Sequence, residues 1–381
     1  MAQILFISSW YPNAHDSTLG IFVKRHAEAA ALYNNIALLH VESDCTIEEP
    51  KIIFSNNNNF TELIIKYPKI KNKLPIISKI LKIKRYKYYY NHGLDVLKLK
   101  GFTPDLVHCN VMNPVGFIAK HWKQKIKTPY ILTEHWTGFL ASDGRYAKNS
   151  ILKFSLPKIA NAAEKILPVS LDLKEALMQN NLGKNFQIVH NVVNTEKFYP
   201  QNKTKNKFLV VADLENTQKN IPGIINAFKV FSETNTEITL SLVGGGNDEG
   251  LILEHINKLD LSTKVKLHGR IPPEKINNLL AESYASILFS NYENLPCVIV
   301  EAFAAGIPFI STNVGGVHEI INEERGVLIP VNDETALVHA MHQVLKTDWN
   351  HEAIMNYAIN TFSYQKIGQE FDTVYKEVIG V

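Results

Sequence analysis

The strongest signal for the fold is the stretch Ser290-Asn291-Tyr292-Glu293-Asn294-Leu295-Pro296-Cys297-Val298-Ile299-Val300-Glu301-Ala302-Phe303-Ala304-Ala305-Gly306-Ile307-Pro308. It follows a short apolar run at 287–289 that is typical of a strand, and its own apolar spacing predicts a helix that begins near Pro296 and ends at Gly306. On this interpretation Glu293 lies in the loop before the helix and Glu301 lies within the helix. A strand, a loop and a helix in this order are the repeating unit of α/β domains.

The loop and the start of this helix have the character of a phosphate site. A helix N-terminus leaves backbone N–H groups free and carries partial positive charge, here near Leu295, Cys297 and Val298. Glu293 and Glu301 flank these groups, and carboxylates accept hydrogen bonds from sugar and ribose hydroxyls. The arrangement therefore suits a sugar nucleotide. The alternative, which the spacing alone leaves open, is one surface glutamate and one helix-face glutamate.

Short runs of β-type residues alternate with longer helical stretches along the chain. Such alternation predicts parallel sheets covered by helices on both faces. The runs lie at 4–7, 36–41, 106–108, 130–133, 165–169, 187–190, 208–211, 238–243, 265–267, 286–289, 308–311 and 327–329. We therefore expect an α/β chain of two doubly wound domains in tandem, with the active site in the cleft between them.

A polar interruption near the middle of the chain, 199–207, has the composition of a linker. We place the domain boundary there, with an N-terminal domain at 1–199 and a C-terminal domain at 200–363. The final stretch, about 364–381, has the pattern of a helix. We expect this helix to pack back on the N-terminal domain.

The composition excludes several classes of protein. Apolar residues make up 45% and charged residues 20% of the 381 residues, which is ordinary for a globular protein and excludes a disordered or fibrous one. No apolar run reaches the ~18 residues of a membrane span. Cys45, Cys109 and Cys297 lack the spacing of a disulfide framework or a zinc site. The first residues lack the basic region of a signal peptide, so we expect a cytoplasmic protein.

The net charge of +3 hides a strong asymmetry. Residues 1–190 carry 25 Lys and Arg against 14 Asp and Glu, and the remainder carry 15 against 23. Eleven basic residues and a single acid, Asp95, lie at 66–100. Such a segment fits an anionic membrane surface, which predicts a peripheral protein at the inner face of the cell membrane. A solvated helix face is the alternative.

Several motifs together carry a family resemblance. The stretch 293–306, followed by 314–320 (VGGVHEI), resembles the nucleotide-sugar signature of the retaining glycosyltransferases of family 4. Further matches follow in the family's order along most of the chain. They are 9–12 (SWYP) through 20–23 (GIFV), 105–108 (DLVH), 133–136 (TEHW), 190–198 (HNVVNTEKF), 219–221 (KNI) with 227–228 (AF), and 242–246 (LVGGG). Matches in the right order are far more specific than any one of them alone.

The resemblance implies the GT-B fold, in which two Rossmann-like domains face each other across a central cleft. The N-terminal domain is then expected to bind the acceptor, and the C-terminal domain a nucleotide-diphosphate sugar. The implied reaction transfers the sugar, with retention of its anomeric configuration, to a hydroxyl of a glycan or glycolipid. The implied setting is the synthesis of cell-surface polysaccharide or lipopolysaccharide.

The resemblance also implies roles for single residues. Glu293 is expected to position the sugar hydroxyls, Glu301 to bind the ribose, and His135 to lie beside the transferred sugar. Lys219 is expected to neutralise the diphosphate leaving group, and Gly20 to bring its backbone close to that diphosphate, where a Cβ would obstruct. The alternatives are structural or surface roles, since the chain has fourteen histidines and forty basic residues.

One position departs from the family pattern. The family carries Gly-Arg-Leu at the strand end before the lysine, and its arginine reaches the diphosphate, whereas this chain reads Ala212-Asp213-Leu214. An acid at Asp213 cannot stabilise a diphosphate. Either another cation, such as Arg270, compensates, or the local geometry differs. Asn194 and Val192 are milder departures.

No cofactor is expected. The run 244–246 (GGG) does not fit the dinucleotide fingerprint, and the chain has no P-loop and no Gly-x-Ser-x-Gly elbow. No Asp-x-Asp triad occurs, which fits metal-independent transfer, and no nucleic-acid partner is expected. Two alternatives stay open. One is a non-hydrolysing sugar-nucleotide epimerase, which shares the fold, and the other is a catalytically inactive GT-B binding subunit, which Asp213 makes conceivable.

Overall fold

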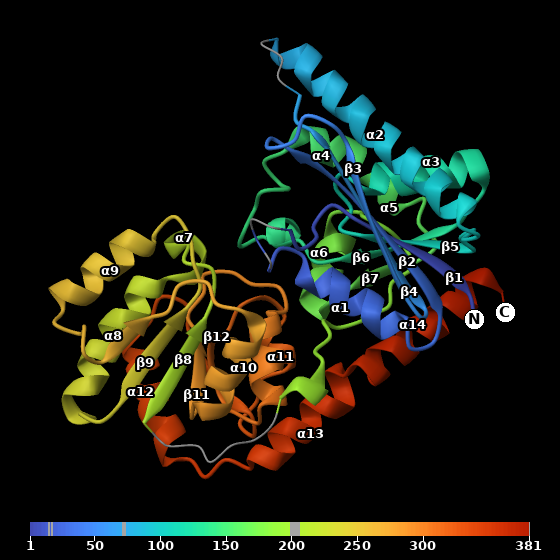
Figure 1. Cartoon of the computed structure of the whole chain (residues 1–381). Coiled ribbons are helices and arrows are strands. Elements are labelled where there is room, and N and C mark those ends of the chain that lie inside the picture. Colours follow the sequence, from blue (N-terminus) through green and yellow to red (C-terminus); the bar gives the residue numbers. More distant parts are fainter. Residues whose placement is uncertain (14–15, 17, 71–73, 199–205, 381) are drawn as a thin grey trace.

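Alternating apolar residues of the first strands face two different layers of helices. Ile4 and Phe6 pack toward α1 (Ile21–Ala30) and α14 (Tyr364–Ile379), and Leu5 and Ile7 pack toward the opposite face of the same sheet. The computed structural model describes residues 1–13, 16, 18–70, 74–198 and 206–380. These residues form two α/β lobes, each with a central sheet covered on both faces (Figure 1).

The first lobe contains a seven-stranded sheet in the described residues, in the order β3-β4-β2-β1-β5-β6-β7. All neighbours are parallel except β3 and β4, which form an antiparallel hairpin at one edge. The strands are β1 (Gln3–Ser8), β2 (Asn35–Asp44), β3 (Lys51–Asn57), β4 (Phe60–Pro68), β5 (Leu106–Asn110), β6 (Tyr130–Glu134) and β7 (Ile166–Pro168). Strands β5 and β6 are buried throughout, as expected for the centre of a parallel sheet.

The second lobe contains a six-stranded parallel sheet in the described residues, in the order β10-β9-β8-β11-β12-β13. The strands are β8 (Lys207–Val211), β9 (Thr239–Val243), β10 (Val265–Leu267), β11 (Ala285–Leu288), β12 (Phe309–Thr312) and β13 (Gly326–Ile329). The order reverses between β8 and β11, and ligands of doubly wound sheets bind at the strand carboxyl ends beside such a reversal. The expected fold class, two parallel-sheet α/β domains, is confirmed.

Helices connect the strands and cover both sheets. In the first lobe they are α1, α2 (Pro75–Leu99), α3 (Gly116–Ile126), η1 (Thr137–Phe139), α4 (Ser150–Ser155), α5 (Pro157–Ala160), α6 (Leu171–Gln179) and η2 (Thr195–Lys197). The second lobe contains α7 (Asn216–Lys219), α8 (Ile221–Thr234), α9 (Glu249–Lys258), α10 (Pro273–Glu282), α11 (Cys297–Ala304), η3 (Gly315–Glu319), α12 (Glu334–Lys346) and α13 (His351–Phe362). Helix α14 follows α13 at the end of the chain.

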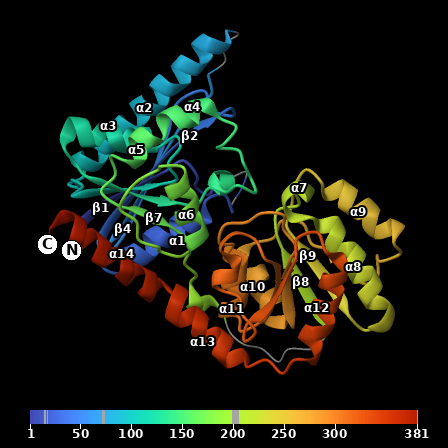
Figure 2. The ribbon, with the colours of Figure 1, turned by 180° about the vertical axis from the view of Figure 1, so that it is seen from behind.

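The last helix crosses from the second lobe to the first. Helices α13 and α14 run along the underside of both lobes in Figures 1 and 2. The Tyr364 hydroxyl donates to the Glu28 carboxylate of α1 at 2.6 Å, and Asn34 donates to Asp372 at 3.1 Å. The backbone N–H of Val193 donates to the Phe362 carbonyl at 2.9 Å where this crossing begins. Most of the linker expected at 199–207 lies outside the described residues.

One local expectation was wrong, and one element was not predicted. The segment 187–190 is not a strand, although the Gln187 and Val189 N–H groups donate to β7. At the outer edge of β7 the described residues form only an isolated bridge between Ile166 and Phe186, and the His190 Nδ1 lies 2.8 Å from the Val169 carbonyl oxygen. The hairpin β3–β4 was not expected, since its outer strand is exposed and polar at one end, and two residues of the asparagine run form its turn.

Buried histidines lie between the first sheet and α14. His26 of α1 is fully buried, and its Nε2 lies 3.1 Å from the His190 carbonyl oxygen. Burial lowers the pKa of His26 to about 4. His108 on β5 contacts the Tyr375 hydroxyl at 2.7 Å, and burial lowers the pKa of His108 well below its usual range. Both imidazoles are therefore neutral in the folded protein at pH 7.

The stability of this lobe should fall in mild acid. Below pH 6.5 the unfolded chain binds a proton at residue 26, whereas the folded chain does not until about pH 4. Between pH 7 and pH 5 we expect the free energy of unfolding to fall by about 2 kcal/mol from His26 alone. Urea unfolding of wild type and His26→Gln at the two pH values measures this. The variant should lose less stability on acidification, and the exposed His339→Gln control should behave like wild type.

Candidate active site

The carboxyl ends of both sheets face a cleft between the lobes. Loops after β8, β9, β10 and β11 place Asp213, Gly244, Arg270 and Glu293 on one wall, and the loop after β6 places His135 on the other. The cleft encloses a cavity of about 380 Å³. Eight of the nine residues selected from the sequence line it: His135, Lys219, Arg270, Glu293, Leu295, Cys297, Val298 and Glu301.

The ninth residue, Gly20, lies beside the cleft rather than in its wall. It precedes α1 with a φ of 63°, in the left-handed region that favours glycine. A Cβ at this position would collide with the Trp10 carbonyl. The backbone conformation and the contact with Trp10 therefore require glycine at this position. The neighbouring residues Thr18 and Ile21 line the cleft.

Glu293 and Lys219 form an ion pair inside the cleft. The Lys219 Nζ lies 2.5 Å from the Glu293 Oε1, and the side chains are 15% and 7% exposed. Because removal of one partner leaves a charge with little access to water, the two residues depend on each other. The sequence selected both residues but did not predict that they touch.

The first turn of α11 opens onto the same cavity. Pro296 precedes this helix, no side chain caps its N-terminus, and Leu295, Cys297 and Val298 line the cleft. The helix therefore presents backbone N–H groups and the positive end of its dipole to the cavity. Burial raises the pKa of the Cys297 thiol to about 12, so this cysteine stays protonated and is not a nucleophile at neutral pH.

Glu301, one helical turn further along, pairs with a residue that sequence analysis missed. Arg25 of α1 reaches across the cleft and places its Nη1 2.6 Å from the Glu301 Oε1. Burial opposes the charged form of Arg25, but the Glu301 carboxylate more than offsets this and raises the pKa of Arg25. The pair joins the two lobes. Its only sequence signal is the position of Arg25 four residues after Ile21, on a helix whose start lines the cleft.

His135 forms part of the opposite wall and has an apolar environment. Its ring packs against Phe22 and His26, with ring centroids 4.2 Å and 5.4 Å away. Burial lowers the pKa of His135 well below its usual range, with smaller contributions from neighbouring histidines. The imidazole is therefore neutral at pH 7. The buried Glu134 carboxylate fixes the loop, because it accepts the N–H groups of His135 and Trp136, both at 2.9 Å.

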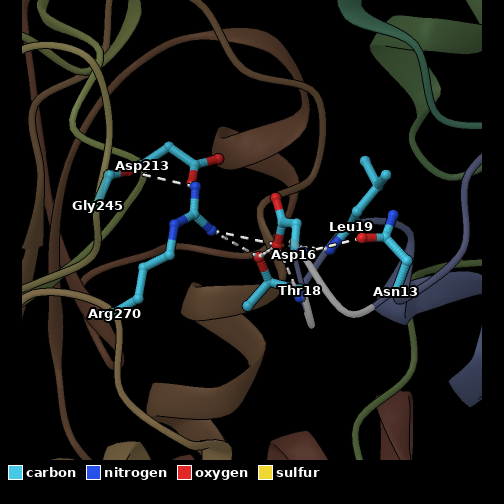
Figure 3. Close-up of polar contacts among 7 residues, drawn as sticks. All are labelled: Asn13, Asp16, Thr18, Leu19, Asp213, Gly245 and Arg270. Carbon is cyan, nitrogen blue, oxygen red and sulfur yellow. Dashed lines mark hydrogen bonds and ion pairs between the residues drawn. The ribbon is translucent and has the colours of Figure 1, made fainter. Parts of the chain in front are cut away.

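Arg270 joins the two lobes at another point of the cleft (Figure 3). Its Nη2 lies 3.2 Å from the Asp213 Oδ1, and its Nη1 lies 3.2 Å from both the Asp16 Oδ1 and the Thr18 Oγ1. Asp213 occupies the position where the family pattern has arginine. The guanidinium of Arg270, from the loop after β10, therefore lies beside the position that the departure leaves without a cation.

Hydrogen bonds and a cation keep Asp16 ionised. Burial opposes its charged form, but hydrogen bonds from Thr18 and the charge of Arg270 together lower the pKa of Asp16.

Within the described residues, no group of three or more His, Cys, Asp and Glu side chains could hold a metal ion. The cleft thus combines cations, carboxylates, free N–H groups and a neutral imidazole, which suits binding of an anion that carries hydroxyl groups.

Two family models match this chain. Residues 67–197 match Glycosyltransferase Family 4, and residues 193–361 match Glycosyl transferases group 1. Together the matches span 67–361, which is 295 of the 381 residues. The chain belongs to the family 4 glycosyltransferases. The matched regions of this glycosyltransferase include His135, Lys219, Arg270, Glu293 and Glu301.

Alignments with relatives of this glycosyltransferase cover most of its length. N-acetyl-alpha-D-glucosaminyl L-malate synthase of Bacillus anthracis is 25% identical over 293 residues, which are 72% of this chain and 75% of that protein. The putative teichuronic acid biosynthesis glycosyltransferase TuaC of Bacillus subtilis is 23% identical over 290 residues, 73% of this chain and 70% of that protein. Both names describe enzymes of sugar metabolism or transfer.

Solved structures share the fold of this glycosyltransferase over nearly its whole length. Sucrose-phosphate synthase from Thermosynechococcus elongatus has a TM-score of 0.77 at 17% identity, with 99% of each chain covered. HepE of Anabaena, in complex with UDP and glucose, has a TM-score of 0.73 at 15% identity, with 99% of this chain and 100% of that chain covered. These likenesses confirm the GT-B fold.

Proposed function

We propose that this glycosyltransferase transfers a sugar from a nucleotide-diphosphate donor to a hydroxyl of a glycan or glycolipid, with retention of anomeric configuration. The observation that carries the proposal is the Lys219–Glu293 pair, which lies in the cleft beside the uncapped first turn of α11. A cation and free N–H groups suit a diphosphate, and a carboxylate suits sugar hydroxyls. His135 on the opposite wall leaves room for a sugar between the lobes.

The diphosphate is assigned to the second lobe. Lys219, Arg270 and the N–H groups of Cys297 and Val298 would neutralise the charge that develops on the leaving group. Arg270 takes the part of the missing family arginine, with Asp213 holding its guanidinium. A bound diphosphate would replace carboxylates as the partner of these cations.

The sugar and the ribose are assigned to the two glutamates. Glu293 would accept hydrogen bonds from the sugar hydroxyls, and Glu301 from the ribose. Neutral His135 would support the electron-poor face of the sugar without adding a competing positive charge. The hypothesised mechanism is attack from the front face, in which the acceptor hydroxyl approaches on the side where the diphosphate leaves and passes its proton to the departing oxygen.

Relatives and neighbours suggest which donor and acceptor to test first. The structures of HepE contain UDP, or UDP-glucose, and TuaC is named for teichuronic acid biosynthesis. We propose a UDP-sugar as the first donor and a cell-surface polymer or its lipid-linked precursor as the acceptor class. The transfer is proposed to need no metal ion, because the cations of the cleft itself are placed to neutralise the diphosphate.

We also propose that the first lobe docks on an anionic bilayer, with the protein at the inner face of the cell membrane. None of the described helices is long and apolar enough to cross a membrane. The first half of α2 extends beyond the sheet, and α4 lies close to it in both views (Figures 1 and 2). Both helices expose large apolar side chains: Ile77, Ile80, Leu81, Ile83, Tyr88, Ile151 and Phe154.

Charge favours a lipid surface as the partner of these helices. The segments 74–90 and 146–163 hold eight Lys and Arg and no Asp or Glu. Exposed apolar side chains beside lysines are typical of interfacial helices, and each basic residue near an anionic bilayer contributes about 1 kcal/mol. Both helices start from loops at the carboxyl edge of the first sheet, so a bilayer here would lie beside the cleft that receives the acceptor.

Replacing Glu293 should nearly abolish transfer. We expect Glu293→Gln to lower kcat by about 100-fold or more, because the sugar, which becomes electron-poor in the transition state, loses a nearby carboxylate. Glu301→Ala should chiefly weaken donor binding, seen as a higher KM with a smaller loss of kcat. A thermal-shift panel of UDP-, GDP- and ADP-sugars identifies the donor first. The exposed Glu282→Gln serves as the control, and an unchanged rate in Glu293→Gln would refute the assignment.

Removing the Arg270 guanidinium should weaken binding of the free nucleoside diphosphate. Charge-assisted hydrogen bonds contribute about 1.5–3 kcal/mol, so Arg270→Ala should raise the Kd for UDP or GDP by about tenfold to a hundredfold. Calorimetry at two salt concentrations measures the effect, which should shrink at high salt. The matched control is Arg85→Ala on α2. Equal affinities for Arg270→Ala and wild type would show that another group meets the diphosphate.

Vesicle co-sedimentation tests the membrane proposal. Wild type should sediment with vesicles that contain phosphatidylglycerol at low salt, and less so at high salt or with neutral vesicles. Ile80→Ser with Ile83→Ser, and Ile151→Ser with Phe154→Ser, should each reduce binding. Leu251→Ser with Leu253→Ser on α9 removes equally exposed side chains from the other lobe and should bind like wild type. Absence of binding at low salt ends the proposal.

A further inference from the structure

The loop that carries Glu293 is held from the opposite lobe. Asn294 follows Glu293 directly, and its side chain is buried. Its amide nitrogen donates to the His135 carbonyl oxygen at 3.2 Å, and its oxygen accepts from the Ser170 hydroxyl at 2.7 Å. One short side chain therefore connects the two residues proposed to face the sugar. Both of its partners belong to the first lobe.

The Ser170 hydroxyl has a second partner and belongs to a larger contact. It caps α6 by accepting the Leu173 N–H at 3.1 Å. The remaining N–H groups at this helix start, those of Leu171 and Asp172, donate to the Glu319 carboxylate at 2.8 Å and 3.0 Å. Glu319 belongs to the second lobe, at the end of η3. The N-terminus of a first-lobe helix is thus satisfied by a second-lobe acid.

Two glycines allow η3 to approach both the Glu293 loop and α6. The Gly316 N–H donates to the Asn294 carbonyl oxygen at 2.9 Å, so η3 is hydrogen-bonded to the Glu293 loop. A Cβ on Gly315 would collide with the Glu293 carbonyl, and a Cβ on Gly316 would collide with the Ser170 side chain. The motif 314–320 is therefore more than a family signature in this chain, because it also contacts the Glu293 loop and the start of α6.

We infer that Ser170, Asn294 and Glu319 form an interdomain clasp that positions Glu293 against His135 when the lobes close. The three residues are positioning residues. Ser170 and Glu319 do not line the cavity, and Asn294 borders it, but its side-chain oxygen and nitrogen are both engaged by first-lobe groups. Each hydrogen bond of the clasp joins one lobe to the other. The Glu319 carboxylate accepts two of them, and these are charge-assisted. If the lobes part, Glu293 loses its spacing from His135, while Lys219, α11 and the Arg270–Asp213 pair keep their arrangement within the second lobe.

This inference rests on the proposed roles of Glu293 and His135, and it predicts a separation of binding from turnover. Asn294→Ala should lower kcat at least about tenfold, because the acceptor-side geometry is lost. The Kd for UDP or GDP should stay within about twofold of wild type, because the diphosphate groups lie within one lobe. Steady-state kinetics with the donor found in the thermal-shift panel, together with calorimetry, gives both values.

A double-mutant cycle tests whether the residues act as one unit. Ser170→Ala combined with Asn294→Ala should cost no more in kcat than the more damaging single change, as is typical of groups in one network. Asn350→Ala is the matched control. It removes a helix cap in the second lobe, where the Asn350 Oδ1 accepts the Ala353 N–H at 2.9 Å, and should lower the melting temperature without lowering kcat.

Small-angle X-ray scattering supplies a readout that does not depend on catalysis. Glu319→Gln keeps the shape of the side chain but replaces one carboxylate oxygen by an amide nitrogen. One backbone N–H of α6 then faces a donor and loses its acceptor. We expect a larger radius of gyration than wild type for this variant and for Asn294→Ala, with or without UDP. The scattering experiment tests the clasp even if the wild-type protein transfers sugar from no donor in the panel. Such a lack of transfer would count against the proposed function but not against the clasp.

Three results would overturn the clasp. The first is Asn294→Ala with a kcat within twofold of wild type. The second is a loss of nucleotide affinity in step with the loss of turnover, which would make Asn294 part of the donor site. The third is scattering of the Asn294→Ala and Glu319→Gln variants that matches wild type.

Discussion

Parallel strand pairing determines where the chemistry of this protein lies. Because neighbouring strands run in one direction, their carboxyl ends collect at one edge, and residues up to 80 positions apart, from Asp213 to Glu293, meet there. The first sheet presents the same kind of edge and brings His135. Each lobe alone has only one wall of the cleft. The site exists because two sheets of similar winding direct their carboxyl ends at each other.

Paired charges dominate the interior of the cleft. Within the described residues that line it, all three of its lysine and arginine side chains have a carboxylate partner: Lys219 with Glu293, Arg25 with Glu301, and Arg270 with Asp16 and Asp213. Pairing offsets the cost of removing these charges from water. Two of the pairs join the lobes, so the same contacts that neutralise the cleft also hold its walls together.

Sequence reasoning reached the fold and eight of the residues that line the cleft for a physical reason. Strand ends, helix starts and motif order are local properties, and they located Glu293, Lys219 and His135. Contacts between lobes leave no local trace. Nothing in the neighbourhood of Arg25 or Ser170 indicates a partner more than a hundred positions away, and Glu319 stood in a recognised motif without a role. Gly20 is the opposite case. It belongs to a recognised motif, but the structure explains it by a local steric requirement and not by a place in the wall of the cleft.

The place where the last helix leaves the second lobe limits how the lobes can move. Val193, near the end of the first lobe, is paired with Phe362 and Ser363, where α13 gives way to α14. The segments that join the two halves are therefore fastened together along one line. Sliding of one lobe past the other would break the pairing of Val193 with Phe362 and Ser363, whereas a hinge rotation centred on this point would preserve it.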